Sequence, residues 1–214
     1  MAKRESKDFS WSTFYAHRKA VRKIYPSIYK VQIKKKLFDV VMEELKGGEL
    51  VLDVGASTKA LGDRIKKTGK ADVIYKTMDI DSATDHDYHS LEEIEEKFDV
   101  IILSEVIEHI EFNEGIEFLK SLKELLVPGG RLIVSTPNLN HPNRYFQDPD
   151  HKTPYTYETL GAALEESGLS LSVMYRIYND SIIRRTLRLY ITTWLYRYLD
   201  IDFAKSIVAV AVKG

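Results

Sequence analysis

Short apolar segments alternate with amphipathic ones along most of the chain. Runs rich in apolar and β-branched residues occur at 50–54, 72–79, 98–103 and 131–136, and such runs are typical of strands buried in a parallel sheet. Between them, apolar residues recur every three or four positions, most clearly over 113–126, which predicts helices with one buried face. This alternation predicts an α/β fold with helices on both faces of the sheet.

The ends of the chain follow a different pattern. Thr156 is a candidate N-cap for a helix to about Ser167, and 169–178 is expected to form a strand. A long helix over 181–199 and a closing strand over 206–212 complete the chain. Residues 1–45 are mainly helical in pattern, so we expect a helical N-terminal lid on one domain spanning 46–214.

The composition excludes several classes of protein. The 214 residues are 44% hydrophobic and 29% charged, and none is cysteine. This balance argues against disorder, and the absence of cysteine excludes disulfide scaffolds, thiolate zinc sites and cysteine nucleophiles. The first residues carry no apolar segment, so we expect neither a signal peptide nor a membrane anchor, and a cytoplasmic location.

Charge is segregated although the net charge is only −1. Residues 1–36 hold eleven basic and two acidic residues, whereas 77–117 hold fourteen acidic residues and one basic residue. Such blocks either steer a charged ligand or compensate each other within the fold. Because aromatic residues are interleaved with the N-terminal basic ones, RNA binding is one possible use of that block.

Candidate ligand-binding residues stand where strands are expected to end. Open α/β sheets bind ligands beyond the carboxyl ends of their strands. The residues at these ends are Asp53 and Gly55, Asp79 and Asp81, and Ser104 and Glu105. An acid after the second strand suits ribose hydroxyls, which suggests a nucleoside-containing cofactor. The segment 53–59 has one glycine instead of three, which disfavours a nicotinamide oxidoreductase.

Four ordered motifs, LVLDVG at 50–55, MDID at 78–81, FDVIILSEVIEH at 98–109 and LKELLVPGGRLIVSTPN at 122–138, resemble those of class I S-adenosylmethionine-dependent methyltransferases. The resemblance covers about residues 45–170. It implies a Rossmann-like seven-stranded sheet with an antiparallel last strand, and S-adenosylmethionine as cofactor. The cofactor contacts it implies are Asp53, Gly55, Ala56, Ser57, Asp79, Ile80, Asp81, Asp87, Ser104 and Glu105.

The sequence departs from the family pattern at two places. Ser57 and Lys59 stand where the family usually has glycine. The interval from Asp79 to Phe98 is short and leaves room only for a short strand and a polar helix at 91–97. This placement would bring Asp87 and Tyr88 near the adenine, unless the segment is a solvated acidic loop.

Two histidines are candidate catalytic residues. His109 follows Glu105 and Glu108, and the three would share one face of a helical turn. His151 follows the strand that ends near Thr136, so it is expected at the same edge of the sheet. Glu105, Glu108, His109 and His151 are therefore candidate ligands for a divalent metal such as Mg²⁺. Metal-free proton transfer by His109 or His151, or a structural role, are the alternatives.

This cluster resembles the metal-using O-methyltransferases of ubiquinone biosynthesis and those that methylate small RNAs. We therefore expect an O-methyltransferase acting on a small-molecule, glycan or lipid-linked acceptor. The alternatives are an RNA ribose methyltransferase and a non-catalytic methyltransferase-like partner subunit. The basic and aromatic segment 182–198 either packs on the sheet, lines the acceptor pocket, pairs two subunits or rests on a membrane surface.

Overall fold

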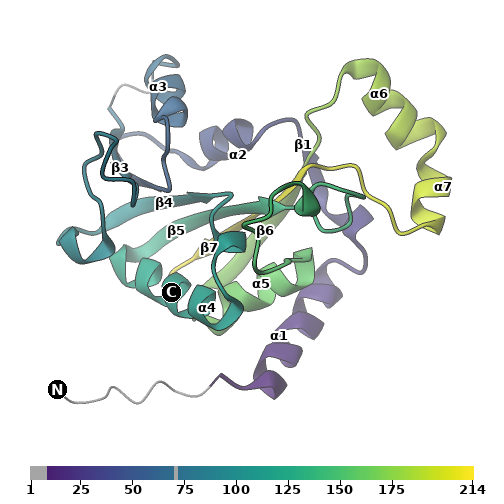
Figure 1. Ribbon diagram of the computed structural model, residues 1–214, viewed down its shortest axis with the longest axis horizontal. Helices are drawn as coiled ribbons and strands as arrows, with labels where there is room; N and C mark the ends of the chain where they lie inside the picture. Colours follow the sequence, from purple (N-terminus) through teal and green to yellow (C-terminus); the bar gives the residue numbers. More distant parts are fainter. Residues whose placement is uncertain (1–8, 70–71) are drawn as a thin grey trace.

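A single seven-stranded sheet runs through the centre of the protein (Figure 1). The computed structural model describes residues 9–69 and 72–214, so the first eight residues of the basic segment lie outside the described residues. In spatial order the strands are β1 (Gln32–Lys34), β6 (Ser170–Ile177), β7 (Ser206–Val212), β5 (Leu126–Pro137), β4 (Phe98–Ser104), β2 (Leu50–Val54) and β3 (Ile74–Met78). Only β7 among them runs antiparallel to its neighbours. The predicted α/β fold with an antiparallel closing strand is confirmed.

Helices cover both faces of the sheet (Figure 1). Helices α2 (Leu37–Glu44) and α3 (Ala60–Lys66) lie on one face, and α1 (Trp11–Ile24), α4 (Phe112–Leu125) and α5 (Tyr157–Glu166) lie on the other. The side chains of Ile101, Ile102 and Leu132 in the central strands are fully buried. Thr156 caps α5, since its hydroxyl accepts a hydrogen bond from the Thr159 N–H at 3.2 Å.

The segment between β3 and β4 is less regular than the sequence pattern indicates. The expected strand is reduced to an isolated bridge between Met78 and Tyr88. The predicted helix over 91–97 is wrong, because only a single 3₁₀ turn, η2 (Leu91–Glu93), forms there. Four glutamates occur within 92–96, and their mutual repulsion disfavours a helix. Glu96 instead pairs with Lys76 on β3.

The N-terminal segment is built into the sheet assembly. Strand β1 pairs in parallel with β6 and so supplies the seventh strand. A 3₁₀ turn, η1 (Ile28–Lys30), precedes it. Helix α1 packs on α5 and buries Phe14 and Val21, while Glu158 of α5 accepts hydrogen bonds from Arg18 and Arg22. Strand β1 is not predicted by the sequence pattern, because the strand is short and polar.

The long helix expected over 181–199 is broken. It consists of α6 (Ile182–Thr186), a π-helical turn (Leu187–Ile191) and α7 (Thr193–Tyr198), and none of these contains a buried residue. It projects beside the β1 and β6 edge of the sheet (Figure 1). Packing of this segment on the sheet is therefore not observed. No helix within residues 9–69 and 72–214 has the length and apolar character needed to cross a membrane.

Candidate active site

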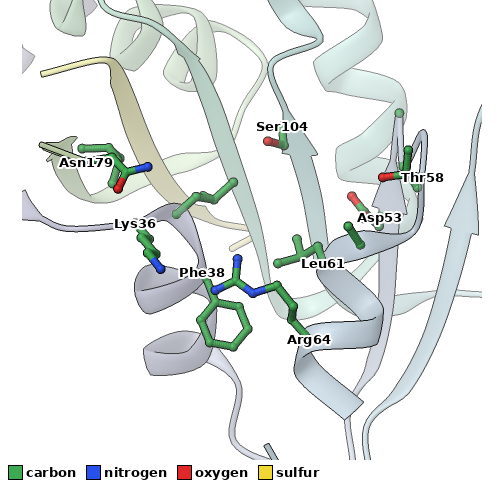
Figure 2. Close-up of a pocket in the computed structure, with 13 residues that line it drawn as sticks. Lys36, Phe38, Asp53, Thr58, Leu61, Arg64, Ser104 and Asn179 are labelled. Carbon is green, nitrogen blue, oxygen red and sulfur yellow. The ribbon is translucent and has the colours of Figure 1, made fainter. Parts of the chain in front are cut away.

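A cavity of about 480 Å³ opens beyond the carboxyl ends of β2 and β4, between α2 and α3 (Figure 2). Its wall includes Asp53, Gly55, Ala56 and Ser104 of the predicted cofactor contacts. Arg64 of α3 lies over the ring of Phe38 of α2, with 4.0 Å from the guanidinium carbon to the ring centroid. Of the segment expected to form a lid, Lys36, Leu37 and Phe38 line this cavity.

Asp53 is the buried acid of the cavity wall. Side chains alternate along a strand, so Asp53 faces the same side of the sheet as Val51, toward α3. Its Oδ2 accepts a hydrogen bond of 2.7 Å from the Tyr75 hydroxyl. Burial raises the pKa of Asp53 to about 6 despite this hydrogen bond. A cation that enters the cavity would favour the ionised carboxylate and lower this pKa again.

The loop after β2 takes a conformation that glycine normally provides. Gly55 has φ +74°, and a Cβ there would lie 2.4 Å from Cγ2 of Val106. Its N–H donates to the carbonyl of Met78 at 2.8 Å. Ser57 and Lys59 have φ +44° and +55°, so these two residues keep a left-handed backbone without being glycine, at a cost in strain.

Asp79 holds this loop from the end of β3. Its carboxylate accepts hydrogen bonds from the N–H of Ser57 at 2.8 Å and of Asp81 at 3.0 Å. Partial burial opposes ionisation, but these two donors outweigh it and hold the pKa of Asp79 below its usual value. Ile80 and Asp81 are exposed. Asp87 is held by the backbone N–H and hydroxyl of Thr77.

A second cavity of about 330 Å³ adjoins the first and shares Ser104, Ile177 and Asn179 with it. Glu105 and Arg144 also line the second cavity. Glu105 has φ +53°, its Oε1 accepts a hydrogen bond from Ser135 at 2.9 Å, and its Oε2 lies 3.7 Å from Arg144. These contacts place charged groups of both signs beside the end of β4.

Glu108, His109 and His151 form a compact cluster in which one ligand atom from each lies within 4.8 Å of the others. Neither carboxylate oxygen of the fully buried Glu108 has a hydrogen-bond partner among the described residues. The ring of His151 donates through Nδ1 to the Tyr145 carbonyl at 2.6 Å, which leaves Nε2 facing Glu108 Oε1 at 3.9 Å. Burial, followed by the charge of Glu105, raises the pKa of Glu108 to about 8.

Glu105 does not join this cluster. The helical turn predicted through 105–109 does not form, and only a 3₁₀ turn, η3 (Ile107–His109), is present. The left-handed backbone of Glu105 breaks the turn before it begins and directs its side chain toward Ser135 and Arg144. The backbone carbonyl of Glu108 accepts from the N–H groups of Lys152 and Thr153 at 2.8 and 3.0 Å, which holds the loop bearing His151 beside Glu108.

Comparison with protein families gives a match over residues 29–172, about two thirds of the chain, to a family described as a methyltransferase domain. The chain belongs to this methyltransferase family. No match to a curated protein was found. The enzyme uses S-adenosylmethionine, the cofactor of this class, and its cavity at the ends of β2 and β4 lies where open α/β sheets bind ligands.

Solved structures share the fold of this methyltransferase. A methyltransferase from Archaeoglobus fulgidus is 15% identical with a TM-score of 0.59, and the match covers 94% of each chain. A chain from the complex between the Haloferax volcanii Trm112 methyltransferase activator and a methyltransferase is 12% identical with a TM-score of 0.59, covering 96% of this chain and 99% of that one. A methyltransferase from Aquifex aeolicus is 15% identical with a TM-score of 0.56, covering 92% and 98%.

Several residues that line the two cavities or contact Asp53 and His151 carry no signal in the sequence. Tyr75, the partner of Asp53, is the second residue of β3, and nothing in the pattern sets it apart from other strand tyrosines. Arg64 is one of many basic residues on helix surfaces. Tyr145 contributes only a backbone carbonyl to His151, which sequence reasoning does not reveal. Arg144, two residues after a proline in a loop, offered no spacing signal either.

Proposed function

We propose that this enzyme transfers the methyl group of S-adenosylmethionine to a hydroxyl oxygen, and that Glu108, His109 and His151 hold a divalent cation that binds the acceptor. The supporting observation is Glu108, a fully buried carboxyl group that lacks a hydrogen-bond partner among the described residues. It faces the Nε2 lone pair of His151. A carboxyl group and an imidazole lone pair that face each other can both be satisfied by a proton or by a metal ion held between them.

The ligand set suits a metal ion. Carboxylate and imidazole bind Mg²⁺, Mn²⁺ or Zn²⁺ at about 2.0–2.3 Å, and three donor atoms within 4.8 Å of one another can reach a common centre after a small shift. The hydrogen bond from Nδ1 of His151 to Tyr145 fixes the ring for ligation through Nε2. When bound, the cation would lower the pKa of an acceptor hydroxyl.

The two cavities would bind different reactants, the first the cofactor and the second the acceptor. In the first, the Asp53 carboxylate suits an ammonium group, and Lys36 and Arg64 in the same wall suit a carboxylate. This pairing matches the amino-acid end of S-adenosylmethionine. The second cavity, with Glu105 and Arg144, would orient the acceptor, and Ser104 lines both. Orientation of two bound reactants accounts for a large part of catalysis in such a displacement.

The first experiment measures metal binding by calorimetry with Mn²⁺ and Mg²⁺. We expect the wild-type enzyme to bind at least one of the two ions, and Glu108→Gln to weaken binding at least tenfold, because it removes the only charged ligand. Glu105→Gln is the matched control: its carboxylate is held by Ser135 and Arg144, so metal binding should persist. Cofactor binding should be retained in Glu108→Gln.

The second experiment measures methyl transfer from labelled S-adenosylmethionine to hydroxyl-bearing acceptors, with amine-bearing analogues beside them. We expect transfer to the hydroxyl compounds, and loss of transfer in a chelator with restoration by Mn²⁺ or Mg²⁺. Transfer that persists in a chelator and in Glu108→Gln would assign proton transfer to His151 without a metal. Methylation of the amines alone would overturn the proposal of an O-methyltransferase.

A further inference from the structure

The segment 181–199, here termed the β6–β7 insertion, has an unusual composition. It contains four arginines and four aromatic residues, and it has no acidic residue. The remaining positions are mostly isoleucine, leucine and threonine. A stretch of this composition combines apolar surface with positive charge, a pattern typical of segments that bind at an interface.

The apolar residues of the insertion face outward. Nine of the fifteen large hydrophobic residues that are exposed in the described part of the chain belong to it. Ile182 and Tyr198 are each 83% exposed and Trp194 is 70% exposed. A concentration of this kind in one short segment marks an interaction surface, since scattered single residues are the normal state of a protein surface.

The insertion is nevertheless held firmly at its base. The Tyr29 hydroxyl donates to the backbone carbonyls of Tyr196 and Ile201 at 3.1 and 3.0 Å. Arg188 pairs with Asp180 at 2.6 Å, and its guanidinium carbon lies 3.9 Å from the ring centroid of Phe203. The exposed residues are therefore presented on a fixed scaffold.

We propose that the β6–β7 insertion binds the surface of an anionic lipid bilayer. Arg184, Arg185 and Arg197 have no acidic partner within residues 9–69 and 72–214, so their charges are available to lipid phosphates. Trp194 and Tyr198 are of the residue types that prefer the level of the headgroups. Ile182 and Ile183 supply the apolar side chains that enter the acyl boundary.

A second copy of this chain suits the insertion less well. A two-fold interface places the same patch on both partners, so it would bring unpaired arginines against arginines with no acid inside the segment to compensate. Anionic headgroups supply the missing negative charge. The charge of the segment therefore favours lipid over self-association.

The β6–β7 insertion lies next to the second cavity. Ile177 and Asn179 just before it, and Lys205 and Ser206 just after it, line the second cavity. A bilayer under the insertion would thus lie beside the cavity that we assign to the acceptor. This last step rests on the proposed function, and it identifies the acceptor as an amphiphile carried in the bilayer.

The test measures binding of the full chain to phosphatidylcholine vesicles with and without about 30% phosphatidylglycerol. No cofactor or acceptor is present, so this result is independent of methyl transfer. We expect sedimentation with the anionic vesicles only. Substituting Arg184, Arg185 and Arg197 together by glutamine should weaken binding at least about tenfold. The triple variant Ile183→Ser, Trp194→Ser and Tyr198→Ser should abolish it. Ile24→Ser, which removes an exposed isoleucine elsewhere, should leave it unchanged.

Tryptophan emission gives a second readout, because the chain has only Trp11 and Trp194. In Trp11→Phe, we expect the emission of Trp194 to shift to shorter wavelength on anionic vesicles, and in Trp194→Phe we expect no shift. Absence of binding at low salt, or equal binding of all variants, would overturn the proposal. So would a dimer in solution that the serine variant dissociates. Retained cofactor binding in every variant shows that the fold is intact.

Discussion

At the residue scale, the site depends on backbone conformations that few side chains tolerate. Gly55, Ser57, Lys59 and Glu105 all have positive φ and all follow strands β2 or β4. Three of them are not glycine, so the protein accepts strain of order 1 kcal/mol or more at each position. Strained residues persist where surrounding structure fixes them, and they gather at functional sites.

The first prediction concerns Gly55→Ala. A Cβ at this position would lie 2.4 Å from Cγ2 of Val106, so we expect a loss in unfolding free energy of about 2–4 kcal/mol and weaker cofactor binding. Gly48→Ala is the matched control: its φ is +69°, but nothing lies within 4 Å of the added atom. It should cost only about 1 kcal/mol. Urea unfolding measures both.

A double variant tests whether the contact with Val106 causes the loss in stability of Gly55→Ala. Val106→Ala removes the atom that a methyl group on residue 55 would meet, so the double variant should recover most of the difference between Gly55→Ala and Gly48→Ala. No recovery would mean that backbone strain alone, and not the Val106 contact, requires glycine at this position.

At the element scale, helices α1 and α5 are joined by a buried acid. Glu158 accepts hydrogen bonds from Arg18 and Arg22 of α1 and from the neighbouring Tyr157 hydroxyl. Burial opposes its ionisation, but the donors outweigh burial and lower the pKa of Glu158 below its ordinary value. The ionised carboxylate therefore ties α1 to the rest of the fold.

The corresponding prediction is that Glu158→Gln lowers the free energy of unfolding by about 1–3 kcal/mol at pH 7. Because the pKa is lower in the folded state, the contribution of Glu158 is fully present above its unfolded pKa of about 4.5 and disappears as the pH falls through its folded pKa. The difference between wild type and variant should thus shrink in acid. Glu117→Gln, in an exposed pair with Lys120, should change stability by less than about 0.5 kcal/mol at any pH.

The elements differ in how well sequence predicts them. Strands β2, β4 and β7 are almost continuous apolar runs because both faces of the sheet are covered, and such runs stand out. Strand β1 has no such signal, since it is three residues long and lies at the edge. The break in the predicted helix at Leu187–Ile191 has no sequence signal either, because this stretch contains no proline or glycine.

The candidate site, like the fold, is predicted from the sequence only in part. Strand ends predict the positions of Asp53, Gly55 and Ser104 in the cavity wall, because topology alone brings parallel strand ends together. The backbone turn at Glu105 is a single left-handed residue, and sequence does not reveal it. Its consequence, the separation of Glu105 from the Glu108 cluster, could not be predicted either.

At the scale of the whole molecule, the N-terminal segment is part of the core. Phe14 and Val21 are each only 2% exposed, and β1 covers the edge of β6. We therefore predict that a chain beginning at residue 36 loses cooperative urea unfolding, because it leaves the apolar surface of α5 uncovered. Circular dichroism during urea titration measures this.

Substitutions on the outer side of α1 provide the control. Tyr15 and Ile24 are 56% and 61% exposed, so replacing both by alanine should leave the unfolding midpoint nearly unchanged. A shortened chain that still unfolds cooperatively at the wild-type midpoint would show that residues 1–35 act as a detachable lid.

The β6–β7 insertion joins two strands that already pair with each other along their whole length. Ile177 at the end of β6 and Ser206 at the start of β7 are partners in the β6–β7 ladder, and the Lys205 N–H donates to the Ile177 carbonyl at 2.8 Å. The insertion begins and ends at one point of the sheet, so its length and surface can change without shifting any strand. The insertion can therefore vary in length and in side chains while the sheet and the cavities at its strand ends keep their positions.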